Sequence, residues 1–266
     1  MPVESNRIVN GDCREILREF PERSIDMIVT SPPYDNLRSY GGYEFVFEEI
    51  AEELARVLRV GKVIVWVVAD ATIGGSETGT SFEQALFFKK LGMKLHDTMI
   101  FRKRNPIPQV YRKRYTNEFE YMFVFSKGKV TTHNPIMVPT LHAGLQLKST
   151  TYKNYSKGDQ KRKKPANPVK EKKLRGNIWE YVIGKNKIDA FAKKHPAPFP
   201  VQLAYDHIIS WTNPGELVLD PMCGIGSACL AAKLAGRRYL GIDVNQNYCF
   251  LAKERLKGEE QEELSV

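Results

Sequence analysis

The chain has 266 residues, 42% of them hydrophobic, and a formal net charge of +9. This length suits one large α/β domain with a small insertion, and the hydrophobic share supports a buried core. Four cysteines, Cys13, Cys223, Cys229 and Cys249, lack both the C-x-x-C spacing of metal sites and a disulfide framework. The longest apolar run is too short to cross a bilayer, and the first residues lack an apolar signal region. We therefore expect a cytoplasmic protein without a metal site or a membrane anchor.

The first informative stretch is an apolar run at residues 25–29, followed directly by Thr30-Ser31-Pro32-Pro33-Tyr34. The run predicts a buried strand, which the two prolines end abruptly. Because a residue before proline is held in an extended conformation, the carbonyls here face outward. The motif predicts a rigid ledge with a hydroxyl, carbonyl acceptors and an aromatic face, which suits a planar ring that carries an exocyclic amine. A plain turn after a strand is the alternative.

The next segments alternate between strand and helix patterns. Apolar residues at 47, 50, 54, 57 and 58 predict a helix that Gly61 closes. A buried strand is predicted at 63–68, and a helix at 81–91 with Ser81 as its N-cap and Gly92 beyond it. Residues 96–102 and 119–125 predict two strands that form an antiparallel pair. Such alternation favours an open, mostly parallel sheet with helices on both faces.

Positive charge is concentrated in two places. Residues 148–175 contain 11 Lys or Arg against Asp159 and Glu171, which equals the net charge of the whole chain. Basic residues with interleaved tyrosines suit a nucleic-acid phosphate backbone, although a solvated loop is the alternative. Residues 131–180 break the alternation, and Trp179 is expected to be a packing anchor where the main fold resumes. The candidate nucleic-acid contacts are Arg102, Lys103, Arg104, Arg112, Lys113, Arg114, Lys161, Arg162, Lys163 and Lys164.

Residues 216–243 predict a strand, a glycine-containing turn, a small-residue helix and a second strand. Asp220 and Asp243 would then stand at the ends of adjacent parallel strands, where a ribose and a charged tail can be bound. Gly224 and Gly226 allow a tight turn and close approach of a ligand. Ser227 stands where the dinucleotide motif continues toward a further glycine, so NAD(P) is not expected.

Here the motifs resemble a known family. Asp220-Pro221-x-x-Gly224-x-Gly226 resembles the S-adenosylmethionine motif of the amino-methyltransferases of DNA, and Thr30–Tyr34 resembles their catalytic motif. The order of catalytic motif, basic segment and cofactor motif is that of the β class, and the resemblance covers nearly the whole chain except about 131–180. It implies a Rossmann-like, doubly wound, mostly parallel α/β sheet of the class I methyltransferase type. It also implies S-adenosyl-L-methionine as cofactor and double-stranded DNA as substrate.

The resemblance also implies roles for individual residues. Residues 1–130 would be the catalytic half of the methyltransferase domain, 131–180 a basic target-recognition insertion, and 181–266 the cofactor-binding half. Catalysis would fall to Ser31, Pro32, Pro33 and Tyr34. The cofactor would be bound by the early Gly11-Asp12-Cys13 motif, the His195–Pro200 segment, the glycine turn and the second acid, that is by Asp12, Cys13, Phe199, Pro200, Asp220, Pro221, Cys223, Gly224, Gly226 and Asp243.

In the mechanism that the resemblance implies, the target base is flipped out of the duplex and stacks on Tyr34, while Ser31 and the Pro32 carbonyl hold its amine. Within the family, Ser at this position accompanies mostly cytosine N4, and Asp or Asn mostly adenine N6. We predict N4-methylcytosine, with N6-methyladenine as the alternative. No cysteine follows a proline, which argues against cytosine-C5 chemistry.

Two other classes of protein remain open, a non-catalytic nucleic-acid-binding scaffold and an RNA methyltransferase. A cognate restriction endonuclease and a second copy of the chain are the protein partners that the family suggests. The sequence alone does not distinguish a partnered enzyme from a solitary one.

Overall fold

The computed structural model describes residues 3–33, 45–108, 113–141, 143–144, 168–183 and 200–258. The chain divides into a main unit, Met1–Asn134 with Asn177–Val266, and a smaller unit, Pro135–Gly176. In the smaller unit, strand β8 (Met137–Pro139) pairs antiparallel with β9 (Lys172–Leu174). The small unit lies within the predicted insertion, and its role in target recognition stays a prediction.

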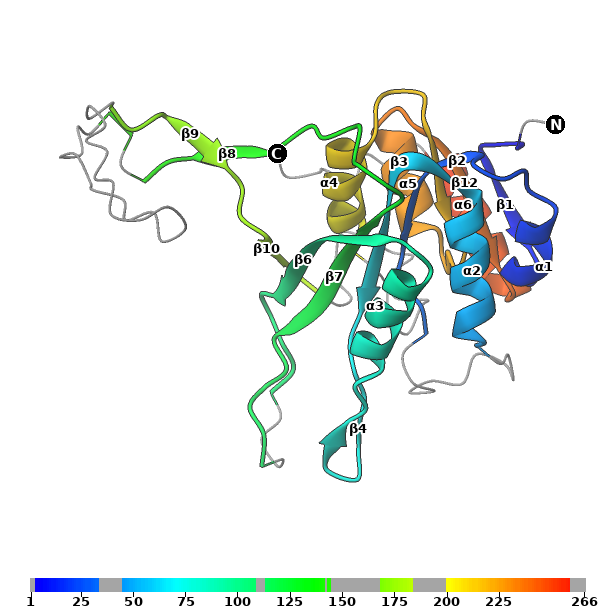
Figure 1. The fold of residues 1–266 in the computed structure, drawn as a ribbon, viewed down its shortest axis with the longest axis horizontal. Helices are drawn as coiled ribbons and strands as arrows, with labels where there is room; N and C mark the ends of the chain where they lie inside the picture. Colours follow the sequence, from blue (N-terminus) through cyan, green and yellow to red (C-terminus); the bar gives the residue numbers. More distant parts are fainter. Residues whose placement is uncertain are drawn as a thin grey trace. The chain divides into compact units, whose positions relative to one another are not determined.

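The described residues of the main unit form one eight-stranded sheet in the order β1-β12-β11-β2-β3-β7-β6-β10 (Figure 1). All neighbouring strands are parallel except at β7, which is antiparallel to both β3 and β6. The predicted mostly parallel sheet and its antiparallel pair are therefore confirmed. The strands span β1 Arg7–Asn10, β2 Ile25–Thr30, β3 Leu58–Val68, β6 Lys94–Lys103, β7 Phe119–Ser126, β10 Ile178–Tyr181, β11 Leu217–Asp220 and β12 Arg238–Asp243.

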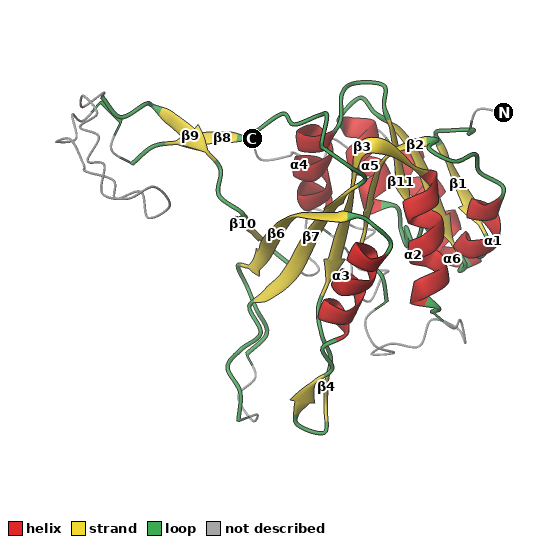
Figure 2. Cartoon of the chain, viewed as in Figure 1, coloured by secondary structure: helices red, strands yellow, loops and turns green. Residues whose placement is uncertain are grey.

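Helices cover both faces of this sheet (Figure 2). Helices α1, α2 and α3 pack against one another in sequence, and α4, α5 and α6 form a second packed set. A short hairpin, β4 (Thr72–Ile73) with β5 (Ser76–Glu77), follows β3. None of the described helices is long and apolar enough to cross a bilayer. The helices span α1 Cys13–Arg18, α2 Phe47–Val57, α3 Thr80–Lys90, α4 Val201–Trp211, α5 Ser227–Leu234 and α6 Gln246–Lys257.

The core lies between the central strands and the α1–α3 layer. Every residue of β2 is buried, as its apolar run predicts. Trp66 and Phe125, from neighbouring strands, pack with Phe88 of α3, whose ring lies 4.6 Å from that of Phe125. On the opposite side of the sheet, Trp179 of β10 is buried with its ring 4.5 Å from His207, so it is the predicted packing anchor.

Two predicted helix ends were wrong. Helix α2 stops at Val57, and Gly61 instead lies inside β3 with φ +83°, where its N–H donates to the Lys127 carbonyl at 2.7 Å. A Cβ at Gly61 would lie 2.5 Å from Thr131, so the glycine permits a close approach of the next segment. Helix α3 begins at Thr80 after Gly79, and Ser81 lies inside it. The Ser81 N–H and hydroxyl donate to the Asp70 carboxylate, which therefore acts as the cap.

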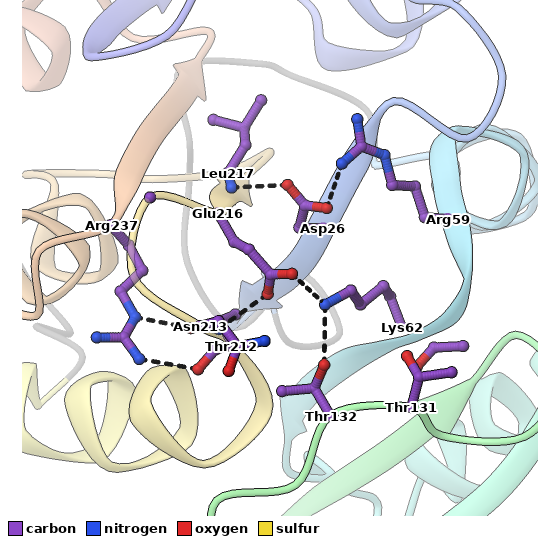
Figure 3. A network of polar contacts seen from close by, with 12 residues as sticks. Asp26, Arg59, Lys62, Thr131, Thr132, Thr212, Asn213, Glu216, Leu217 and Arg237 are labelled. Atoms are coloured by element: carbon purple, nitrogen blue, oxygen red, sulfur yellow. Dashed lines mark hydrogen bonds and ion pairs between the residues drawn. The ribbon is translucent and has the colours of Figure 1, made fainter.

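A polar network joins strands at the amino ends of β2 and β11, opposite the motif-bearing ends (Figure 3). Lys62 Nζ lies 2.5 Å from Glu216 Oε1 and 3.1 Å from the Thr132 hydroxyl. Asp26 accepts from Arg59 and from the Leu217 N–H. Because residues just after 131 bond here, and because β10 belongs to the sheet, the smaller unit begins later and ends earlier than the predicted insertion.

Candidate active site

The site is built where the strand order reverses. From β2 the chain passes to β3 on one side, and from β11 it passes to β12 on the other. In open α/β sheets, ligands bind in the crevice outside the carboxyl ends of the strands at such a switch point. The Ser31-Pro32-Pro33 ledge follows β2, and the glycine turn follows β11, so the two predicted motifs meet there.

One buried hydrogen bond joins the two motifs. The hydroxyl of Thr30, the last residue of β2, donates to Asp220 Oδ1 at 2.8 Å, and the Met222 N–H donates to the same oxygen at 3.2 Å. Thr30 is fully buried and Asp220 is 6% exposed. The predicted adjacency of Asp220 and Asp243 is also found, because β11 and β12 pair in parallel.

Asp243 organises the turn through both of its oxygens. Oδ2 accepts from the Gly224 N–H and Oδ1 from the Asn245 N–H, each at 2.8 Å. A carboxylate offers about four lone-pair sites, so each oxygen can accept a further bond from a ligand hydroxyl. The carboxylate thus ties the glycine turn to the end of β12 and still offers acceptors.

Burial raises the pKa of both acids. The pKa of Asp220 is raised to about 7 by burial, against the lowering effect of the Thr30 and Met222 hydrogen bonds, and the Asp243 charge raises it further. Burial likewise raises the pKa of Asp243, against two backbone hydrogen bonds. A cation or a hydroxyl donor beside these carboxylates favours their ionised forms.

The turn between β11 and α5 needs its glycines. Gly224 has φ +51° and Gly226 φ +78°, a region that L-residues with a Cβ rarely adopt. A Cβ on Gly226 would lie 3.0 Å from the Cβ of Ala252 in α6. Cys223 is buried, and its Cys229 neighbour and burial hold the pKa of its thiol well above the usual range. Cys223 therefore presents its backbone, not a reactive thiolate, to a ligand.

The ledge itself is partly exposed. Ser31 and Pro33 are half-buried and Pro32 is buried, directly after β2. Tyr34, predicted to stack on the base, lies outside the described residues, as does Phe199 of the predicted cofactor segment. Pro200 is described and is the N-cap residue of α4.

The early motif reaches the same edge from β1. The Gly11 N–H donates to the Asp243 carbonyl at 3.0 Å, which brings this segment beside the second acid. Asp12 caps α1 by accepting from the Arg14 N–H at 2.8 Å and also pairs with the Arg14 guanidinium. The Cys13 side chain is buried in the core. A cofactor contact from Cys13 would therefore be made by its backbone.

The described members of the basic cluster are ion-paired. Arg102 Nη1 lies 2.9 Å from Glu180, Arg104 lies 3.6 Å from the same carboxylate, and Lys103 lies 3.0 Å from Glu120. Their charge toward a phosphate backbone is thus partly compensated. Arg114 pairs with Glu77 at 3.5 Å. Arg112, Lys161, Arg162, Lys163 and Lys164 lie outside the described residues.

The sequence analysis missed two residues of this region. Thr30 was treated only as part of the motif, yet it links the ledge to Asp220. Asp70 was not singled out, although it follows β3 at the same edge and holds α3. A polar residue directly at the end of a wholly apolar strand is the signal that could have identified both. Among the described residues, no group of three or more His, Cys, Asp or Glu is arranged to hold a metal ion.

Comparison with known proteins identifies the family. The DNA methylase family model matches residues 25–254. The orphan methyltransferase M.BamHII of Bacillus amyloliquefaciens is 48% identical over 251 residues, which cover 93% of this chain and 90% of that protein. The chain belongs to the DNA methylase family. The DNA adenine methyltransferase YhdJ of Escherichia coli K12 is 24% identical over 95% of this chain and 83% of its own length.

Solved structures of DNA methyltransferases share the fold. The cytosine-N4-specific PvuII DNA methyltransferase superposes with a TM-score of 0.71 at 19% identity, over 98% of this DNA methylase chain and 90% of its own. A DNA modification methylase of Thermus thermophilus, TTHA0409, solved with S-adenosyl-L-methionine, has a TM-score of 0.64 at 27% identity, over 96% and 94%. The class I methyltransferase fold predicted from the motifs is therefore confirmed.

Proposed function

We propose that this DNA methylase transfers a methyl group from S-adenosyl-L-methionine to the exocyclic N4 of a cytosine flipped out of double-stranded DNA. The observation that carries the proposal is the hydrogen bond from Thr30 to Asp220. It joins the ledge that would hold the amine to the turn that would hold the methyl donor. Held reactants in near-attack geometry account for a large share of the rate in transfers of this kind.

The residues of the turn fit the cofactor, which supplies an electrophilic methyl group when bound. Asp243 accepts from the ribose hydroxyls with the lone pairs that Gly224 and Asn245 leave. Gly224 and Gly226 let the ligand approach the backbone closely, and Asp220 with Pro221 forms the start of this turn. Asp12, Cys13, Cys223, Phe199 and Pro200 complete the proposed set, with the two cysteines acting through their backbones.

The ledge activates the base amine. The lone pair of the exocyclic nitrogen is conjugated into the ring, so the nitrogen is a poor nucleophile. Acceptors from Ser31 and from the Pro32 carbonyl hold its two N–H groups and draw it toward tetrahedral geometry, which frees the lone pair. Pro33 keeps the ledge rigid, and Tyr34 stacks on the ring. One amine proton leaves to solvent after the methyl arrives, so no strong base is required.

Ser31 supports the choice of cytosine, because cytosine N3 is an acceptor and a hydroxyl can donate to it, whereas an ionised carboxylate cannot. The PvuII enzyme, cytosine-N4-specific by name, has the same fold. The alternative is adenine N6, which YhdJ, named as an adenine methyltransferase, favours.

Double-stranded DNA is the proposed substrate, with the basic small unit as its target-recognition part. M.BamHII is described as an orphan enzyme, which favours a solitary methylase over one that works beside a restriction endonuclease. A homodimer stays a prediction that analytical ultracentrifugation can check.

The deciding experiment is mass spectrometry of nucleosides from plasmid DNA incubated with the purified protein and S-adenosyl-L-methionine. We expect N4-methylcytosine. N6-methyladenine would overturn the choice of base, and methyl transfer to structured RNA alone would overturn the choice of substrate. Cofactor binding without transfer to either would favour a scaffold.

The role of the ledge is tested by Ser31→Ala. We expect kcat to fall by about 100-fold with little change in cofactor affinity, since one positioned polar partner of the transition state is lost. Ser24→Ala is the matched control, because Ser24 precedes β2 at the opposite edge of the sheet. An unchanged kcat in Ser31→Ala would remove Ser31 from the mechanism.

A further inference from the structure

A second cleft opens at the same edge of the sheet, one strand beyond the ledge. Its volume is about 540 Å³, and its walls come from the end of β3, the β4–β5 hairpin and residues 113–121 that lead into β7. Thr30 is paired with Trp66 of β3, and Val68 of β3 with Tyr121 of β7. Adjacent strands are about 4.8 Å apart, so a chain whose target base lies on the ledge passes directly over this cleft.

The cleft carries aromatic surface that packing does not explain. Tyr115 is 99% exposed and Phe119 43% exposed, and the Phe119 ring lies 5.4 Å from that of Tyr121 in an edge-on contact. All three residues line the cleft. A fully exposed phenol gains nothing from the core. Exposed aromatic faces of this kind are platforms on which unstacked nucleic-acid bases bind.

The charges of the cleft separate an acidic interior from a basic rim. Asp70, Glu77 and Glu120 line its wall, and the charges of Asp70 and Glu77, together with burial, raise the pKa of Tyr121. Carboxylates only accept hydrogen bonds, so this interior favours amine donors. At the rim, Lys113 makes no ion pair with another described residue, whereas Arg114 pairs with Glu77. A base with an exocyclic amine fits inside, and its phosphate fits beside Lys113.

The hairpin wall is held in place by its own geometry. Gly74 and Gly75 both have positive φ, which a two-residue hairpin turn of this kind requires. The Arg114 guanidinium donates to the Gly75 carbonyl, so the hairpin is tied to the segment that carries Tyr115. The Thr78 N–H donates to the Ala71 carbonyl at 3.0 Å, which fixes the base of the hairpin to the end of β3. The cleft therefore exists before any ligand binds.

From these observations we infer that the catalytic unit itself binds the base next to the target on the same DNA strand, and that it prefers an amine-bearing base there over thymine. The inference rests on the proposed function, because the target base has to lie on the ledge. Sequence would then be read in two places, in the smaller unit and at this cleft. Thymine is disfavoured since its O4 is an acceptor that faces carboxylates.

The test is a binding cycle on duplexes that carry the motif methylated by the wild type. Dissociation constants are measured, with S-adenosyl-L-homocysteine present, for wild type and Tyr115→Ala on intact DNA and on DNA with an abasic site beside the target. We expect Tyr115→Ala to weaken binding of intact DNA by about 5- to 100-fold, the range found for stacking of one base. With the neighbouring base removed, the two proteins should bind equally, and Tyr115→Phe should resemble wild type.

Matched variants exclude a general effect. Phe250→Ala removes a 62%-exposed ring from α6, and Lys94→Ala removes a cation at the start of β6, so neither should change the cycle. Lys113→Ala should weaken binding and reduce its salt dependence. The inference is overturned if Tyr115→Ala binds as wild type, if the abasic neighbour leaves its defect unchanged, or if only an abasic target position cancels it. A wild type that methylates no DNA would instead refute the proposed function.

Discussion

At the scale of single residues, the site depends on polar groups placed where the surrounding strand is wholly apolar. Thr30 is the clearest case, because its buried hydroxyl donates to the same Asp220 oxygen that the Met222 N–H reaches. Hydrogen bonds to charged groups contribute more than neutral ones, and an orphaned buried partner is costly. The ledge is thus anchored through the residue just before it.

This anchoring predicts the outcome of two substitutions at Thr30. Thr30→Val keeps the shape but removes the donor, so we expect a loss of about 2 kcal/mol in the free energy of unfolding and a higher KM for the cofactor. Thr30→Ser keeps the donor and should lose only about 1 kcal/mol with the buried methyl group. Urea unfolding and steady-state kinetics measure both effects. Equal stability of the two variants would show that the hydroxyl contributes nothing.

The raised pKa of Asp220 predicts a pH-dependent stability. In the folded protein this pKa is about 7, above the value of 3.8 for an unperturbed carboxyl. The folded state therefore binds more protons between these values, and this residue makes stability fall as pH rises from about 4 to about 7. Asp220→Asn retains an oxygen acceptor for Thr30 and Met222 but does not titrate.

We accordingly expect Asp220→Asn to gain stability relative to wild type between about pH 5 and about pH 8, by up to about 4 kcal/mol. The measurement is urea unfolding of both proteins at the two pH values. Asp243 titrates in both proteins, so its contribution cancels. The same difference at both pH values would contradict the assignment of this pKa.

At the scale of elements, the glycine turn is confined by the strand beside it. A Cβ on Gly241 of β12 would lie 2.6 Å from Ile8 Cδ1, 2.7 Å from the Cys229 sulfur and 2.8 Å from the Cys223 sulfur. No positive φ is involved here, so the requirement is one of space alone. The turn and α5 can approach the sheet this closely because β12 carries no side chain at this position.

Gly241→Ala should therefore lower stability by about 1 to 3 kcal/mol through overpacking. Adding Cys229→Ala should restore part of the loss, because it removes the sulfur that the new methyl group meets. Gly176→Ala is the control, since nothing lies within 4 Å of a Cβ there. Thermal unfolding of the four proteins measures the effect, and a double variant no more stable than Gly241→Ala would argue against steric crowding.

The elements that the sequence predicted correctly are those specified by neighbouring residues. The apolar run of β2, the prolines after it and the positive-φ glycines of the turn are all local signals. The failures involve partners distant in sequence. Ser81 was taken as an N-cap because its pattern fits, but the cap is Asp70, 11 residues earlier. Likewise, the basic cluster reads as free charge until Glu180, 78 residues after Arg102, is brought beside it.

At the scale of the whole molecule, the two edges of the sheet have different tasks. The ledge, the turn and the cleft lie at the carboxyl edge, whereas the Lys62–Glu216 network lies at the amino ends of β2 and β11. The Lys62 side chain is 10% exposed and that of Glu216 22% exposed, so solvent screens this pair poorly. Removing one partner of such a pair leaves an uncompensated charge.

Lys62→Met should therefore lower the free energy of unfolding by about 3 kcal/mol, with kcat unchanged while the protein is folded. Adding Glu216→Gln should recover part of the stability. Lys257→Met breaks an exposed pair with Glu254 and should change stability by less than about 0.5 kcal/mol. Unfolding and methyl-transfer assays on the same samples separate the two properties, and a loss of kcat in folded Lys62→Met would refute the division of tasks.

The strand order has a consequence for synthesis on the ribosome. Strand β1 pairs with β12, and β2 has β11 as one neighbour, so strands made early wait for strands made late. Until β11 emerges, the wholly apolar β2 is an edge strand of an unfinished sheet, which is the type of surface that aggregates or recruits chaperones. The glycine turn also follows β11. A nascent chain is therefore unable to modify the genome that encodes it until translation has passed β12.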